Sequence, residues 1–228
     1  MDQLHYLQMQ ILKKLLFSEG STFSQLIGEN IETNQHNFHL QKLIGLMLIE
    51  KNGSIYKLTL KGKEFANTMD TDSQLKVKQA KLSVLCCCFK DEGTKVLIYT
   101  RKKHPFYNYQ GFFSGKINYG ETVSETAKRE LYEEVGLKGE PEVKGLRHFK
   151  VYSEEKKLLE DKFMFYVRFD NPEGELNPNE EGEYKWIKTS DIKEFIKKPF
   201  HDFFESYDML INSSSFYFNE LDVITSEF

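Results

Sequence analysis

The feature that most constrains this chain is a stretch of helical periodicity between Thr122 and Gly136. Apolar residues recur there at every fourth position and form one stripe: Val123, Ala127, Leu131 and Val135. Thr122, with Glu125 three residues later, is typical of a capping box at the start of a helix. Gly136 suits the left-handed residue that commonly ends one. The pattern predicts a single helix whose apolar stripe lies on a sheet.

The other side of this predicted helix carries a cluster of glutamates. Glu130, Glu133 and Glu134 lie at i, i+3 and i+4, which gathers their carboxylates on one patch. Like charges at this spacing repel by a few tenths of a kcal/mol per pair. Clustered carboxylate oxygens are the ligands that Mg²⁺ or Mn²⁺ requires. The pattern predicts a divalent metal site, beside which Arg129 can orient a carboxylate and the Gly115 carbonyl can add a ligand.

Residues 115–137 as a whole resemble the Nudix box, written G-x5-E-x7-R-E-U-x-E-E-x-G-U with U aliphatic. The matching positions are Gly115, Glu121, Arg129, Glu130, Leu131, Glu133, Glu134, Gly136 and Leu137. A chance match in a chain of this size is on the order of one in ten million. Weaker similarity extends from about residue 80 to 197. One departure is Ser114, where many members have a second glycine.

The resemblance implies an α/β/α sandwich with a mixed sheet. It also implies hydrolysis of a nucleoside diphosphate linked to another group, with one to three divalent ions activating water and neutralising the departing phosphate. Carried over by position, Glu130, Glu133 and Glu134 would be metal ligands, with the Gly115 carbonyl as a further one. Arg129 and Glu121 would orient them.

The proton acceptor is either a glutamate of the box or a carboxylate on a later loop. Glu181 is our candidate on that loop, with Glu180 and Glu183 beside it; a solvated acidic turn is the alternative. Three other glutamates have a weaker claim: Glu154, Glu155 and Glu160.

Substrate contacts are predicted on both sides of the loop that precedes the box. Arg101 and Lys116 can attract phosphates, and Phe106 and Tyr107 can stack on a base. A solvated basic cluster and core packing under the loop are the alternative interpretations. A damaged nucleoside triphosphate, a sugar nucleotide, a dinucleotide and a capped RNA end all remain open as the nucleotide-like substrate.

The residues before the box divide into two segments. Residues 1–72 show three helical patterns, starting near Leu4, Thr22 and Thr33, and a hairpin that turns at Asn52-Gly53. This order resembles a winged helix-turn-helix, a small α+β domain. We expect a linker at 73–79 and a Nudix domain at 80–228. Within it, the pattern predicts strands at 82–89, 95–100, 143–152, 161–169 and 184–188, and a helix at 190–197.

A winged helix suggests DNA as a partner. The residues that could contact DNA are Asn34, His36, Asn37, Gln41 and Lys57. Through residue 75, however, seven lysines and no arginine face eight acidic residues, so the segment lacks the excess of positive charge that supplies affinity for phosphates. Dimerisation, including a homodimer, or a substrate lid is the alternative role.

The composition excludes several classes of protein. Hydrophobic residues make up 39% of the chain and the net charge is −4, so there is no overall basic field for nucleic acid. The start of the chain lacks a signal-peptide pattern, and no apolar run is long enough to span a bilayer. The adjacent Cys86, Cys87 and Cys88 read as small apolar residues of a buried strand. We therefore expect a cytoplasmic protein that does not contact membranes.

Two functional hypotheses follow. The first is a Mg²⁺-dependent (or Mn²⁺-dependent) hydrolase with an accessory winged helix. The second is a transcription regulator that senses a nucleotide metabolite and binds DNA. Regulators of the Nudix superfamily usually carry a degraded box and place the winged helix after the sensor. The intact box and the reversed order here favour the hydrolase.

Overall fold

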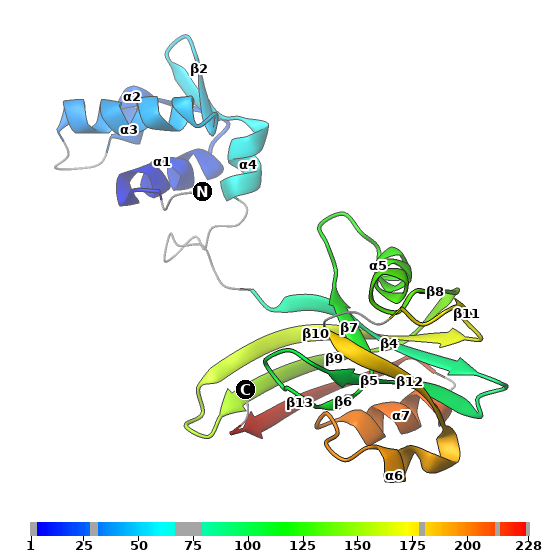
Figure 1. The fold of residues 1–228 in the computed structure, drawn as a ribbon. Helices are drawn as coiled ribbons and strands as arrows, with labels where there is room; N and C mark the ends of the chain where they lie inside the picture. The colour runs from blue at the N-terminus through cyan, green and yellow to red at the C-terminus, as the bar shows by residue number, and fades with distance from the viewer. Residues whose placement is uncertain (1–3, 28–31, 67–78, 178–180, 213–214, 227–228) are drawn as a thin grey trace. The chain divides into compact units, whose positions relative to one another are not determined.

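The computed structural model describes residues 4–27, 32–66, 79–177, 181–212 and 215–226. The chain divides into two compact units, Met1–Lys78 and Gln79–Phe228 (Figure 1). Most of the predicted linker, residues 73–78, lies outside the described residues.

The first unit contains four helices and a three-stranded antiparallel sheet. Its elements are α1 (Tyr6–Leu16), β1 (Ser21–Thr22), α2 (Phe23–Leu26), α3 (Thr33–Gly45), β2 (Ile49–Asn52), β3 (Ile55–Leu58) and α4 (Leu60–Ala66). The sheet order is β1-β3-β2, and Gly53 has the positive φ that the hairpin turn requires. The three predicted helices and the hairpin are present, and the arrangement fits a winged-helix-like domain.

Helix α4 directly follows the hairpin and was not predicted. Thr59 ends the second hairpin strand by capping the helix, since its hydroxyl accepts a hydrogen bond from the Gly62 amide at 3.0 Å. A Cβ at Gly62 would lie 1.8 Å from the Leu48 carbonyl oxygen. Only glycine therefore allows α4 to pack directly on the backbone before β2.

The second unit is built on one mixed sheet. The strands of this unit are β4 (Lys81–Lys90), β5 (Lys95–Arg101), β6 (Gln110–Gly111), β7 (Phe113–Lys116), β8 (Leu137–Lys138), β9 (Pro141–Ser153), β10 (Leu158–Asp170), β11 (Glu173–Gly174), β12 (Gly182–Lys188) and β13 (Tyr217–Thr225). β8 and β11 pair with each other in a separate two-stranded sheet. The main order is β12-β5-β4-β10-β9-β13; β7 pairs with β4, and β6 with β5. The pairs β4–β10 and β9–β13 are parallel and the others antiparallel.

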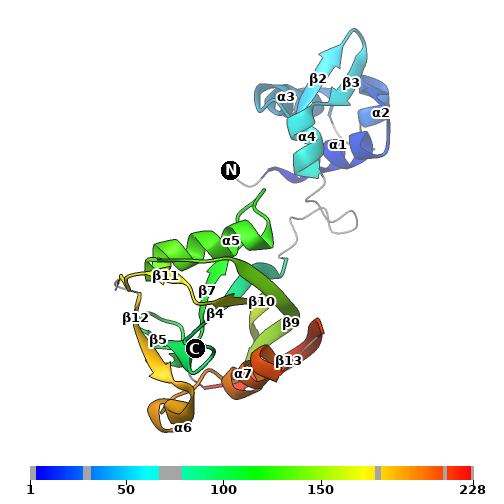
Figure 2. The ribbon, with the colours of Figure 1, turned by 90° about the vertical axis from the view of Figure 1, so that its right-hand side faces the viewer.

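Helices cover both faces of this sheet (Figures 1 and 2). They are α5 (Val123–Glu130) with the π-helical turn Leu131–Val135, the 3-10 turn Thr189–Asp191 with α6 (Ile192–Phe195), and α7 (Phe203–Asn212). Cys86 and Cys88 pack in the cluster under α5, whereas Cys87 packs in the cluster under α6 and α7. The alternation of the three buried thiols between opposite faces confirms the predicted α/β/α sandwich.

The helix before Gly136 begins as predicted and ends differently. The Thr122 hydroxyl accepts a hydrogen bond from the Glu125 amide, and the Glu125 carboxylate accepts one from the Thr122 amide, so the capping box is confirmed. Gly136 is left-handed at φ 83°. The last turn, however, is a π-helix rather than a continuation of α5. Further along, the predicted helix at 190–197 is shorter, and α7 had no prediction. No helix in the described ranges combines the length and apolarity needed to cross a membrane.

Candidate active site

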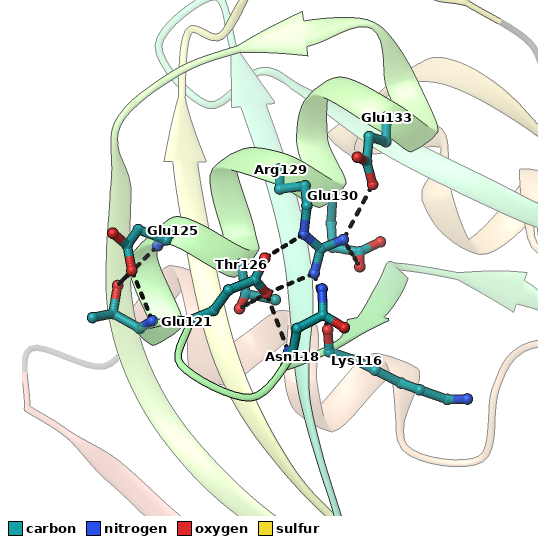
Figure 3. A network of polar contacts seen from close by, with 9 residues as sticks. Lys116, Asn118, Glu121, Glu125, Thr126, Arg129, Glu130 and Glu133 are labelled. Carbon is teal, nitrogen blue, oxygen red and sulfur yellow. Dashed lines mark hydrogen bonds and ion pairs between the residues drawn. The ribbon is translucent and has the colours of Figure 1, made fainter.

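Arg129 is the centre of a polar network on α5 (Figure 3). Its Nε and Nη2 donate to the two carboxylate oxygens of Glu121 at 2.7 and 2.9 Å. Its Nη1 donates to Glu130 at 2.6 Å and to Glu133 at 3.1 Å, and Nη2 also donates to the Lys116 carbonyl at 3.0 Å. A planar guanidinium with five donors can hold this many acceptors at once. Arg129 therefore fixes two box glutamates against the loop before the helix.

Glu121 anchors the other side of this network. Its carboxylate accepts hydrogen bonds from the Thr126 hydroxyl at 2.9 Å and the Asn118 amide at 3.1 Å, besides the two from Arg129. The hydrogen bonds from Arg129, with those from Thr126 and Asn118, hold the pKa of Glu121 well below its usual range. Glu121 is therefore a permanent anion that positions Arg129.

Glu130 lies against Gly115 at the point where the loop meets the helix. A Cβ at residue 115 would lie 1.7 Å from the Glu130 carboxyl carbon, so only glycine leaves room for this side chain. Glu130 is 7% exposed, and burial raises the pKa of its carboxyl despite the hydrogen bond from Arg129. Glu134 and Glu133 raise it further. A buried carboxylate next to two others is electrostatically unfavourable, and a bound cation would stabilise it.

Glu134 and Glu133 differ in their surroundings. Glu134 accepts a hydrogen bond at 2.9 Å from the hydroxyl of Tyr184, which stacks on Tyr99 at 5.2 Å. Glu133 instead turns to Arg129, and its side chain is 59% exposed. Both lie in the π-helical turn Leu131–Val135. Arg129 Nη1 holds Glu130 and Glu133 together, whereas Glu134 is held by Tyr184.

Glu130 and Glu134 open onto a cleft of about 500 Å³. Its other charged side chains are Lys81, Arg101, Lys103, Lys116, Glu160, Lys162 and Glu181; its aromatic ones are Tyr99, Phe106, Phe112 and Phe200. This volume is within the range of small-molecule sites. The wall combines carboxylates, which suit a hard cation, with an excess of ammonium and guanidinium groups, which suit phosphates.

The donors fit a divalent ion. They are carboxylate oxygens around a glycine cradle that a Cβ would fill. Within the ranges that the structure describes, no three Asp, Glu, His or Cys side chains are gathered closely enough to hold a metal as they stand.

The loop between β5 and β6 brings some predicted substrate residues to the cleft. Arg101 lines it, although Arg101 Nε also donates to the Pro105 carbonyl at 2.6 Å and so holds the loop. Lys116 and Phe106 line it as well. Tyr107 does not: its ring is 44% exposed and stacks on His104 instead. The structure therefore joins three of the four predicted substrate residues.

Glu181 also lies in the cleft wall, with its carboxylate in an ion pair with Lys103. Its backbone carbonyl accepts hydrogen bonds from the Tyr99 hydroxyl at 2.9 Å and the Lys102 amide at 2.8 Å, which fixes this loop on β5. Glu183 pairs with Lys102 outside the cleft. Glu180 lies outside the described residues.

Several cleft residues were missed at the sequence level. Tyr99 and Tyr184 meet because β5 and β12 pair in a register that sets them side by side. Lys81 and Lys162 meet because they are partners across β4 and β10. Strand register gives such residues no local signal, although the run from Tyr184 to Ile187 already belonged to the wider Nudix similarity.

In the first unit, four of the five predicted DNA-contacting residues are exposed: Asn34, Asn37, Gln41 and Lys57. His36 is a correction. Its ring is 2% exposed and packs edge-on against Phe23 at 5.8 Å, so it cannot reach a base edge. Because α3 has a buried side facing α1, every third or fourth residue of it belongs to the core, and His36 falls on that side together with Leu40 and Leu43.

Comparison with known proteins places this geometry in a family. The NUDIX domain model matches residues 80–206. A mutator MutT protein from Bacillus halodurans is 21% identical, with 65% of this chain and 93% of that chain covered and a TM-score of 0.53. The NUDIX domain of Shewanella oneidensis NrtR complexed with ADP ribose is 18% identical, with 64% and 94% covered and a TM-score of 0.50.

A MutT NUDIX hydrolase from Burkholderia pseudomallei is also 18% identical, with 58% of this chain and 99% of that chain covered and a TM-score of 0.50. At these identities the structural matches establish the fold, and the family model establishes membership. With the box glutamates Glu130 and Glu134 lining a cation-rich cleft, and the family model matching residues 80–206, this chain belongs to the Nudix family.

Proposed function

We propose that this protein is a Mg²⁺-dependent (or Mn²⁺-dependent) hydrolase that cleaves a diphosphate linkage in a nucleoside diphosphate derivative or a nucleoside triphosphate. The proposal rests on one observation: carboxylates and cations line the same cleft. They are Glu130, Glu134, Arg101, Lys103 and Lys116. Carboxylates next to cations in this way suit a substrate that arrives as a phosphate–metal complex.

Glu130, Glu134 and the Gly115 carbonyl would hold the ion, and Glu133 would join after leaving Arg129. A bound divalent ion supplies a water nucleophile at neutral pH and neutralises charge on the leaving phosphate. The chain's own residues do the rest of the positioning: Arg129 keeps Glu130 aimed past Gly115, and Tyr184 holds Glu134.

The substrate side of the cleft follows from its charges. Arg101, Lys103 and Lys116 would bind the phosphate oxygens, and Phe106 would pack against the remainder of the substrate. Burial and the adjacent Arg101 lower the pKa of Lys103, and a bound phosphate would stabilise its charged form. Glu181, whose backbone is fixed on β5, is the carboxylate that we assign as proton acceptor.

The test is release of phosphate or pyrophosphate with Mg²⁺ across a panel of nucleoside triphosphates, nucleotide sugars and dinucleotides. Glu134→Gln should abolish metal-dependent turnover and leave the fold intact, because it removes a metal ligand from a site that is strained without its ion. Glu140→Gln is the matched control, since Glu140 is an exposed carboxylate that pairs with Lys128 outside the cleft. Equal turnover of Glu134→Gln and the parent would refute the ligand assignment.

The second candidate is a regulator that binds a nucleotide metabolite and DNA. Two observations favour it: the first unit fits a winged helix, and the NrtR NUDIX domain, which is similar in fold, binds ADP ribose. The exposed residues of α3 and the hairpin, Asn37 and Lys57 among them, would contact DNA. A gel shift with the upstream DNA of the protein's own gene is the test. Binding of the panel without turnover, with a salt-sensitive shift, would select this candidate.

A further inference from the structure

The cleft has a second group of charges away from the box glutamates, on the strands β4 and β10. Lys81 and Lys162 are direct partners across this parallel pair, so their side chains leave the sheet next to one another, and both line the cleft. Two adjacent ammonium groups on one face of a sheet repel. Their placement at a cleft wall therefore needs a compensating partner.

Glu160 is that partner. Its Oε1 lies 3.4 Å from Lys81 Nζ and its Oε2 lies 3.2 Å from Lys162 Nζ. The side chains of Glu160 and Lys162 are only 14% and 19% exposed, and Lys162 Nζ also sits 5.2 Å from the centre of the Phe149 ring. Packing and ion pairing together hold this Lys81–Glu160–Lys162 cluster in place.

The cluster is a poor source of general base catalysis. Burial alone would raise the pKa of Glu160, but the two lysines outweigh it and lower the pKa. Glu160 is therefore ionised at neutral pH and weakly basic, which argues against the base role that the sequence left open for it.

What the cluster offers a ligand is a fixed acceptor flanked by fixed donors. A carboxylate oxygen has about two lone pairs and an ammonium three N–H groups. After the two ion pairs, each group keeps capacity for another hydrogen bond. A hydroxyl both donates and accepts, so neighbouring hydroxyls can satisfy both kinds of group. A phosphate only accepts, so it could bind the two ammonium groups but would leave the Glu160 carboxylate without a donor.

We propose that Lys81, Glu160 and Lys162 form a subsite for sugar hydroxyls, which selects substrates whose diphosphate links the nucleoside to a sugar over nucleoside triphosphates. This inference rests on the proposed function, because it assigns the second half of the same cleft. The box glutamates would act at the diphosphate, and the cluster would hold the hydroxyls of the departing sugar phosphate.

The experiment compares ADP-ribose with ATP, which share a base and differ at the far end. Glu160→Gln should raise the KM for ADP-ribose about ten- to hundred-fold with kcat nearly unchanged, which is the effect of losing hydrogen bonds to a charged acceptor. The KM for ATP should stay within about twofold of the parent. Titration calorimetry with the same two compounds measures binding independently of turnover.

Two further variants keep the result interpretable. Lys162→Gln removes a donor and leaves Glu160 paired with Lys81, so it tests the subsite if Glu160→Gln folds poorly. Glu142→Gln is the control, because Glu142 forms a strand ion pair with Lys144 at 2.9 Å outside the cleft.

Three outcomes would overturn the subsite: equal changes for ADP-ribose and ATP, no change for ADP-ribose, or tighter binding of ATP by Glu160→Gln, which would indicate a phosphate site. The hydrolase proposal fails separately, if the parent turns over no compound of the whole panel. Calorimetry tests the subsite without turnover: loss of ADP-ribose binding in Glu160→Gln supports it, and unchanged binding contradicts it.

Discussion

Helices α3 and α5 were predicted from the same kind of evidence, an apolar stripe with polar residues opposite, yet their polar sides differ in kind. On α5 and its π-helical turn, carboxylates of one sign crowd together, one of them is buried, and a single arginine and a glycine are committed to them. On α3, the exposed side carries four uncharged amides and one charged residue, Lys42, besides the exposed Phe38. The crowded carboxylates of α5 therefore indicate a cation site. The surface of α3 indicates no particular function for the first unit.

The largest effect is expected from Gly115→Ala, which tests whether the site on α5 depends on the glycine beside Glu130. The new Cβ would overlap the Glu130 carboxyl group, so either the loop or Glu130 must move. Overpacking of this kind costs about 1–3 kcal/mol. We expect loss of metal-dependent turnover by a factor of at least about 100, since Glu130 can no longer reach its position. Turnover assays and thermal melts would measure both effects.

Gly45→Ala is the matched control on α3. Nothing lies within 4 Å of a Cβ at residue 45, and its φ is not positive. It should keep full activity and melt at the parent's temperature or slightly above it, because alanine favours a helix over glycine. A fully active Gly115→Ala would show that the glycine cradle does not matter to the site.

An intermediate effect is expected from Arg129→Lys. Lysine keeps the positive charge but cannot hold Glu121, Glu130 and Glu133 at once, because it lacks the planar fork of five donors. We expect kcat to fall about ten- to hundred-fold with a smaller change in KM, and the Mg²⁺ concentration for half-maximal rate to rise. Steady-state kinetics over a Mg²⁺ titration would check this.

Arg168→Lys is the control for that substitution. Arg168 also holds a carboxylate and a carbonyl, those of Asp170 and Leu210, but outside the cleft. If both lysine variants lose the same activity, the effect comes from stability, and Arg129 has no special part in positioning the glutamates.

Sequence patterns predicted the features that depend on neighbouring residues. They missed the features that depend on strand register. The helix cap at Thr122, the left-handed Gly136 and the buried cysteines follow from spacing and were confirmed. The cleft wall opposite the helix depends on strand register, which brings Lys81 to Lys162 across 81 residues of sequence. No local pattern encodes that pairing.

Other differences arose inside predicted elements. Arg129 holds Glu133 through an i, i+4 ion pair, and Glu133 does not line the cleft, a difference among the three glutamates that their spacing does not show. His36 was taken for a surface residue because polar residues surround it in the sequence. Its tertiary packing against Phe23 decided otherwise.

The smallest effect concerns the buried side of α3 and would test whether that helix carries strain of its own. Both ring nitrogens of His36 lack a hydrogen-bond partner among the described residues. Burial lowers the pKa of His36, as do the nearby charges of Lys14 and His39. His36 is harder to protonate in the folded unit, so below pH 6.5, its ordinary pKa, the unfolded chain binds more protons. The free energy of unfolding of the first unit therefore falls as the pH falls below that value.

His36→Leu should therefore flatten the decline in stability between about pH 6.5 and the lowered pKa, and it should slightly stabilise the first unit at neutral pH by removing unpaired polar atoms. Turnover should not change. Thermal unfolding at pH 7.5 and 6.0, with an NMR titration of the His36 ring, would measure this, and the exposed Gln35→Ala would serve as the control on the same helix. A His36 pKa at or above 6.5, or an acid slope that His36→Leu leaves intact, would show that burial of His36 costs the first unit nothing.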